Sequence, residues 1–192
     1  MTGDRGTAAG GAGRIRRRGA LLLAGAALAA AGCADADTDV GVPTCEPGQR
    51  LGIVAQSVPD AAYVPCVAVL PPGWSFESFS VDDDGTRFSL RSDRSDRAVD
   101  VELVERCDVG SATPITPRDE GVRTYQLAIS VSPRYAGRLY DVFARGCVVY
   151  EFDFARGPHI ALIDELQQAV QLYPRRQLRQ ELDDELGITL DP

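Results

Sequence analysis

The sequence predicts an α+β fold, with helices packed on one face of an antiparallel sheet of about five to seven strands. Three observations predict this class. Apolar and polar residues alternate through most of residues 76–154, as in half-buried strands. An Asp-Gly turn joins two of the alternating segments. After residue 157 the apolar residues recur with a helical period instead.

The first expected elements are a short helix and a strand. Pro47 suits the first turn of a helix that runs to about residue 55 and stops before Pro59. Residues 62–70 are typical of a strand. Pro65 restricts that strand to a sheet edge or a strand start, because proline cannot donate a ladder hydrogen bond.

The sheet is expected to continue with a hairpin and several longer strands. The sequence "DDDG" at 82–85 separates two alternating segments and predicts a tight turn between them. The clearest later strand pattern is in 97–107, where every second residue is apolar. Residues 122–132 predict another strand, and residues 138–155 predict two more, broken at Arg145–Gly146.

Two helices are expected at the C-terminal end. The apolar positions of the first are Ile163, Leu166, Val170 and Tyr173. Pro174 separates it from the second helix, which Gly187 is expected to cap. Arginines lie at the start of the second helix and acids at its end, which opposes the helix macrodipole. We therefore expect these charges to have partners elsewhere in the fold.

The N-terminal stretch "RIRRRGALLLAGAALAAAGC", residues 14–33, predicts an export signal. Its apolar part, 19–32, would cover only about 21 Å as a helix, against a hydrocarbon core of about 30 Å. "AAGC" resembles the lipobox of bacterial lipoproteins, in which a cysteine is lipidated and the chain is cut before it. The resemblance implies a signal peptide over 1–32 and a mature protein that starts at lipidated, palmitate-bearing Cys33. Ala30 stands where that family usually has leucine.

Other interpretations of this segment stay open. It is also compatible with an ordinary signal peptide cut near Cys33, or with an uncleaved short membrane helix. Arg16–Arg18 resemble a twin-arginine signal that lacks the usual preceding Ser or Thr, so the export route is not settled. Residues 33–44 are small and acidic and predict a flexible tether. Such a tether holds a single domain, 45–192, within roughly 36–40 Å of the lipid.

Charge excludes some partners. The chain has a net charge of −8. Loss of residues 1–32 would remove five of the 20 basic and one of the 28 acidic residues, leaving −12. Such a chain is unsuited to nucleic acid or to docking flat on an anionic membrane. An envelope protein or a wall component is the expected partner, and the lipid is the expected membrane attachment.

The sequence also resembles a known group. All 20 basic residues are arginine, which is typical of a GC-rich bacterium. The segments "LGIVAQSVPDAAYVPCVAVLPPGW", "RFSLRSDRSDRAVDVELVERCD" and "RGCVVYEFDF" are similar to exported or membrane-anchored actinobacterial proteins of unknown function. That similarity implies an extracytoplasmic location and a fold, and it implies no catalytic residues.

Four cysteines remain after Cys33 and predict two disulfides in an exported domain. They are Cys45, Cys66, Cys107 and Cys147. Three pairings exist, of which we favour Cys45–Cys66 and Cys107–Cys147, and free buried thiols are the alternative. No two of them form a close pair of the kind that zinc or thiol redox sites use, so no metal is predicted.

Aromatic residues and acids supply the other candidate sites. Trp74, Phe76 and Phe79 are candidates for an aromatic binding surface, although a lone tryptophan is more often part of a core edge. Glu151 and Asp153 lie on one strand face about 7 Å apart, a spacing that could suit glycoside hydrolysis. Alternating acids on the wet face of a sheet are the commoner explanation.

The remaining candidates have simpler structural explanations. His159 is the only histidine, so neither a catalytic triad nor a multi-histidine zinc site is predicted. Asp82–Asp84 lack the alternate spacing of a calcium loop and fit turn chemistry. The mixed-sign segment containing Arg87, Arg91, Arg94 and Arg97 predicts a solvated hairpin, with recognition of an anionic polymer as the alternative.

These observations favour a non-enzymatic, membrane-anchored surface lipoprotein without a cofactor, whose disulfide-braced domain binds a partner in the cell envelope. Two rival hypotheses come from other classes. One is an envelope hydrolase that uses Glu151 and Asp153. The other is a carrier that holds an apolar ligand between sheet and helices.

Overall fold

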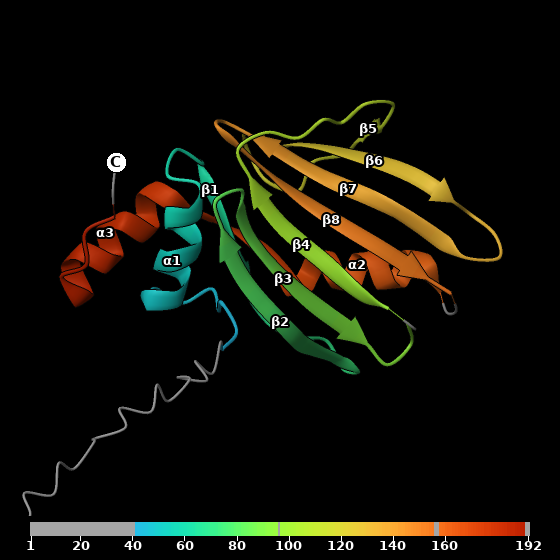
Figure 1. Ribbon diagram of the computed structural model, residues 1–192, viewed down its shortest axis with the longest axis horizontal. Helices are drawn as coiled ribbons and strands as arrows, with labels where there is room; N and C mark the ends of the chain where they lie inside the picture. The colour runs from blue at the N-terminus through green and yellow to red at the C-terminus, as the bar shows by residue number, and fades with distance from the viewer. Residues whose placement is uncertain (1–40, 96, 156–157, 191–192) are drawn as a thin grey trace, which may run out of the picture. The chain divides into compact units, whose positions relative to one another are not determined.

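A seven-stranded antiparallel sheet is the largest part of the structure, a computed structural model that describes residues 41–95, 97–155 and 158–190. The strand order is β2-β3-β4-β8-β7-β6-β5 (Figure 1). The strands are β2 (Trp74–Asp82), β3 (Gly85–Ser92), β4 (Ala98–Val104), β5 (Thr113–Ile115), β6 (Arg123–Ser130), β7 (Tyr135–Phe143) and β8 (Gly146–Phe154). The predicted hairpin is confirmed, since Asp82 pairs with Gly85 across a two-residue turn.

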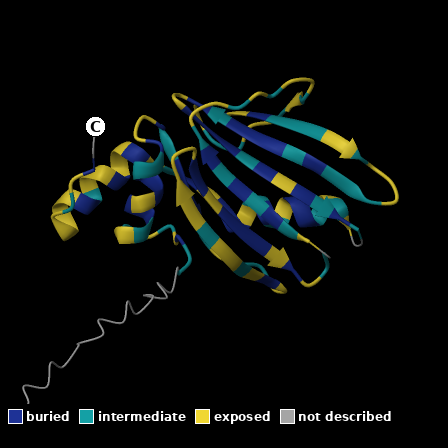
Figure 2. Ribbon diagram, viewed as in Figure 1, coloured by how far each residue is buried: buried dark blue, intermediate teal, exposed yellow. Residues whose placement is uncertain are grey.

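The two faces of this sheet differ in polarity, as the alternating sequence predicts. Val101 of β4 pairs with Tyr150 of β8, and both are fully buried. One position along, Asp100 pairs with Glu151 on the opposite, open face. Figure 2 shows the same alternation as bands of buried and more exposed residues along the strands.

Three helices complete the fold: α1 (Gln49–Ser57), α2 (His159–Ala169) and α3 (Arg175–Leu186). Helix α2 lies against one face of the large sheet (Figure 1), and its buried Leu162 and Leu166 belong to the same core as Tyr150. Helices α1 and α3 contact each other, and α1 also contacts β2 and β3. The predicted α+β class, with C-terminal helices on an antiparallel sheet, is confirmed.

One predicted helix is too long. The apolar spacing predicted a helix through Tyr173, but α2 ends at Ala169 and the chain continues as β9 (Val170–Pro174). This strand pairs with β1 (Tyr63–Val67) in a separate two-stranded sheet. Val170 and Leu172 are buried and alternate with more exposed residues, so the strand period also fits this segment. Pairing with β1, which is distant in sequence, selects the strand.

The predicted disulfide pairing and the predicted helix cap are both confirmed. Cys45 pairs with Cys66 across a Cα–Cα distance of 4.9 Å, and Cys107 pairs with Cys147 across 5.8 Å, as the favoured connectivity predicted. Gly187 caps α3 with a left-handed φ of 63°, a conformation in which glycine carries no Cβ penalty.

Candidate functional site

An open groove lies between α1, the β2–β3 hairpin and the chain that follows α3. We call it the α1 groove. Its volume is about 640 Å³, and known ligand sites measure about 300–1,000 Å³. Its apolar lining consists mainly of Ile53, Val81, Ile188 and Leu190. The groove is therefore a concave, partly apolar surface of the kind that binds ligands.

Helix α1 supplies one wall of the α1 groove because its two faces have different partners. Leu51 and Val54 are buried in the core. Ile53 points away from them and is 42% exposed, and Val81 on the neighbouring hairpin is 41% exposed. These two side chains give the groove apolar surface that the fold itself leaves in contact with water.

The chain after α3 supplies the floor. The turn at Gly187 lets the Ile188 N–H donate to the carbonyl of Leu182 at 3.0 Å, which reverses the chain direction. Leu190 then packs beside Gly52 of α1 and is only 3% exposed. The floor is thus built from residues more than 130 positions apart in sequence, which only the folded chain brings together.

Three carboxylates form the rim of the α1 groove: Asp82, Asp83 and Glu105. Asp82 also shapes the turn, because its Oδ1 accepts the Asp84 N–H at 3.0 Å. Gly85 is required there, since its φ is 144° and a Cβ would collide with the backbone carbonyl of Leu103. Of the described residues that line the groove, none is basic.

The arginines of β3 and of the loop after it pair with acids outside the α1 groove. Arg87 pairs with Glu102 and Arg91 with Glu77. Arg94 donates to Glu165 at 3.0 Å, and Arg97 lies 3.5 Å from Asp153. All four arginines therefore face acids of this chain, as the solvated-hairpin interpretation expects, and the structure gives no separate support to the anionic-polymer alternative.

The aromatic residues singled out from the sequence lie in or against the core. Trp74 is 7% exposed, and its Nε1 donates to Glu165 Oε2 at 2.7 Å. Phe76 and Phe79 are half-buried and pack against the same core. Trp74, the central ring of the predicted aromatic surface, is therefore buried in the core and is not exposed to a partner. The physical reason is that Glu165 of α2 satisfies the indole N–H inside the domain.

The two carboxylates proposed for hydrolysis do lie on one face, and each has an arginine partner. Arg138 Nε donates to Glu151 Oε2 at 2.8 Å, and Arg134 Nε donates to Asp153 Oδ1 at 2.8 Å. The hydrogen bond from Arg134 holds the pKa of Asp153 below its usual value. A glycosidase needs one carboxyl group with a raised pKa to protonate the leaving group. Asp153 is therefore unsuited to be that acid.

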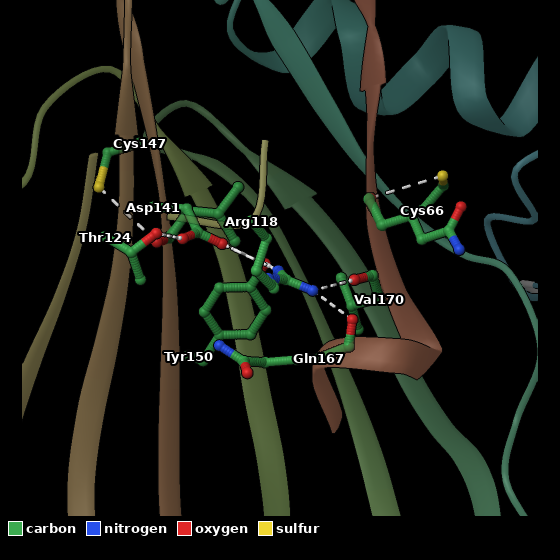
Figure 3. Close-up of polar contacts among 10 residues, drawn as sticks. Cys66, Arg118, Thr124, Asp141, Cys147, Tyr150, Gln167 and Val170 are labelled. Atoms are coloured by element: carbon green, nitrogen blue, oxygen red, sulfur yellow. Dashed lines mark hydrogen bonds and ion pairs between the residues drawn. The ribbon is translucent and has the colours of Figure 1, made fainter. Parts of the chain in front are cut away.

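Figure 3 shows a buried polar cluster that the sequence patterns did not predict. It consists of Arg118, Thr124, Asp141 and Tyr150. Asp141 Oδ2 accepts from Arg118 Nη2 at 3.0 Å and from the Tyr150 hydroxyl at 3.0 Å, and its Oδ1 accepts from Thr124 at 2.8 Å. Burial, followed by the charge of Asp141, raises the pKa of Tyr150 well above its usual value. The phenol therefore stays a hydrogen-bond donor.

This cluster joins the loop after β5 to the end of α2. Arg118 Nη1 donates to the carbonyls of Gln167 and Val170, the latter at 3.2 Å (Figure 3). The last carbonyls of a helix have no partner within the helix, so Arg118 satisfies groups that α2 leaves unpaired. Asp141 is 1% exposed. The cluster is therefore a structural brace.

A sequence signal for the cluster existed in part. Asp141 lies between Leu139 and Phe143 at the inward-facing positions of β7, and an acid there requires a buried partner. The partner, Arg118, is in an irregular polar loop where no pattern marks it.

His159 begins α2 and stacks on Tyr135 with ring centroids 5.3 Å apart. Within the part of the chain that the structure describes, no three His, Cys, Asp or Glu side chains group as metal ligands.

Cys33 and the whole predicted signal peptide, 1–32, lie outside the described ranges, as do residues 33–40 of the predicted tether. None of the helices in the described ranges is both long and apolar enough to cross a membrane. The chain matches no protein-family model, no curated protein and no solved structure.

Proposed function

We propose that this protein is a non-enzymatic binding module of the cell envelope, held at the outer side of a membrane by lipid on Cys33, and that it binds a segment of an envelope partner in the α1 groove. The observation that carries the proposal is the groove itself. It exposes Ile53 and Val81 in a hollow of about 640 Å³, next to the buried Leu51 and Val54 of α1.

The packing of the core supports binding at the groove over transport of a ligand inside the domain. Tyr150, Phe152 and Phe154 fill the inner face of β8 and are at most 2% exposed. Leu162 and Leu166 of α2 belong to the same core and are fully buried. An apolar ligand between sheet and helices would have to displace these side chains, whereas the α1 groove is already open.

Site-specific photocrosslinking in intact cells tests the binding role. A photoreactive residue at Val81 is expected to capture a defined envelope partner, and Ile53→Asp in the same chain is expected to abolish that capture. A photoreactive residue at Ile160, which is 79% exposed on α2, is the matched control. The captured protein is then purified and tested for direct binding to wild-type and Ile53→Asp protein. Equal capture from Val81 and Ile160, or indifference to Ile53→Asp, would exclude the groove.

The anchor requires its own test. Mass analysis of the mature N-terminus is expected to show acyl chains on Cys33, and Cys33→Ala is expected to release the protein from membranes. An unmodified Cys33 in a freely secreted chain would remove the anchor from the proposal and leave the groove untouched.

A further inference from the structure

The charge of the α1 groove restricts the ligand that it suits. This step rests on the binding role proposed above and adds the chemical class of the ligand. Asp82 and Asp83 are exposed at the hairpin turn, and Glu105 follows β4 next to that turn. The three carboxylates therefore concentrate negative charge at one side of an apolar floor.

We propose that the α1 groove binds an extended peptide segment in which arginine or lysine side chains flank an apolar side chain. The apolar side chain contacts Ile53 and Val81. The basic side chains reach the rim carboxylates. None of the described lining residues is basic. Arg106 lies 4.0 Å from Glu105, but both side chains are mostly exposed, so water screens this pair. Ion pairs and apolar contact together give such a segment both orientation and affinity.

The groove's uncharged polar residues favour a peptide over a simple amine or lipid. Gln49 and Gln56 of α1 line the same hollow, and an amide side chain can donate to a peptide carbonyl and accept from a peptide N–H. Ser57 is occupied, because its Oγ donates to the Val54 carbonyl at 2.8 Å and accepts from Thr86 at 2.7 Å. The two glutamines are thus the side chains placed to pair with a peptide backbone.

Charge also excludes other occupants of similar size. An anionic segment would meet three carboxylates, and the arginines on β3 that could screen them pair with Glu102 and Glu77. A purely apolar segment would desolvate the rim acids without a compensating partner, which is unfavourable. The net charge of −8 adds long-range attraction for cations.

A random peptide array tests this inference while the natural partner is still unidentified. The purified protein with its disulfides intact is incubated with random 12-residue peptides, in parallel with Ile53→Asp protein. Sequences enriched by wild type over Ile53→Asp are expected to carry Lys or Arg within about four positions of Leu, Ile or Phe. The strongest peptide is then titrated against the variant Asp82→Asn, Asp83→Asn, Glu105→Gln.

The three amide substitutions keep side-chain size and the Asp82 turn geometry while removing the rim charge. We expect them to weaken the peptide about tenfold and to flatten its salt dependence. Glu77→Gln, which removes an acid outside the groove, is the matched control and is expected to have no effect on binding. Unchanged binding by the triple variant, or enrichment of neutral or acidic peptides, would overturn the ligand class while leaving the groove as a binding site. If no peptide distinguishes wild type from Ile53→Asp, the binding role itself fails.

Discussion

The buried cluster around Asp141 and the rim of the α1 groove are both rich in charge, yet they are built in opposite ways. Asp141 is 1% exposed and accepts three hydrogen bonds from Arg118, Thr124 and Tyr150. Asp82 and Asp83 are exposed, and none of the described residues that line their groove is an arginine. Charge that the fold neutralises internally serves stability, and charge that it leaves in water beside apolar surface is available to a partner.

Removal of Asp141 is expected to have the largest effect, because it leaves the Arg118 charge in a mostly buried site without its counterion. We expect Asp141→Ala to lower the free energy of unfolding by about 3–5 kcal/mol, measured by urea unfolding with the disulfides intact. Glu77→Ala, which breaks an exposed pair with Arg91, should cost at most about 1 kcal/mol. Equal losses would contradict the distinction between the two kinds of charge.

Removal of both Arg118 and Asp141 separates the cost of an unpaired buried charge from the loss of the ion pair. The double variant Arg118→Met, Asp141→Leu replaces a buried ion pair with apolar side chains and leaves no unpaired charge. We expect it to be more stable than Asp141→Ala alone by at least about 1 kcal/mol, because the unpaired charge is the costly element. The unfolding free energies of the two variants decide this, and a double variant that is less stable than the single one would contradict it.

Trp74 tests whether an aromatic residue predicted to bind is instead structural. Trp74→Phe keeps a ring in the core and removes the hydrogen bond to Glu165, so a loss of about 1 kcal/mol in unfolding free energy is expected. Binding of the enriched peptide at the α1 groove should not change. A stable Trp74→Phe protein that no longer binds the peptide would show that Trp74 takes part in binding.

Glu165 links stability to pH. The hydrogen bond from Arg94, helped by that from Trp74 and opposed by burial, holds the pKa of Glu165 below its usual 4.5. Its contribution to stability is therefore complete above about pH 4.5 and is lost as the pH falls through the lower folded value. We expect Glu165→Gln to reduce the decline of unfolding free energy between about pH 5 and pH 3. An unchanged acid slope would contradict this.

The groove residues are expected to affect stability least. Ile53→Asp changes a side chain that is 42% exposed, so its unfolding free energy should stay within about 0.5 kcal/mol of wild type while peptide binding is lost. Thermal and urea unfolding of the purified variant measure this directly. A strong destabilisation would show that Ile53 is part of the core, and binding losses at that position would then carry no information about a site.

Sequence patterns predicted the parts of this fold that depend on neighbours along the chain. The Asp-Gly turn at Gly85, the alternation around Tyr150 and the cap at Gly187 are local features, and all three were predictable. Residues 170–174 fit a helical pattern through Val170 and Tyr173 and a strand pattern through Val170 and Leu172, and only pairing with β1 distinguishes the two. Local pattern is insufficient where a distant segment determines the structure.

The candidate site was not predictable for the same reason. Ile53, Val81 and Leu190 come from a helix, a hairpin and the chain after α3, and nothing in their local sequence links them. Arg118 lies in a loop without periodicity, so the sequence indicated only Asp141 as a member of this ion pair. Residue type alone favours Trp74 over Ile53 as a binding residue. Only the fold shows that Glu165 is the internal hydrogen-bond partner of the tryptophan.

Binding at the α1 groove is tested most directly by mapping the bound peptide onto the protein. Amide NMR spectra of the disulfide-intact domain are recorded with increasing amounts of the strongest peptide from the array. The largest shifts are expected at Ile53, Val81, Asp83 and Leu190, with the signals of Thr124, Asp141 and Tyr150 unchanged. Shifts centred on any other surface, with the α1 groove unaffected, would contradict the account.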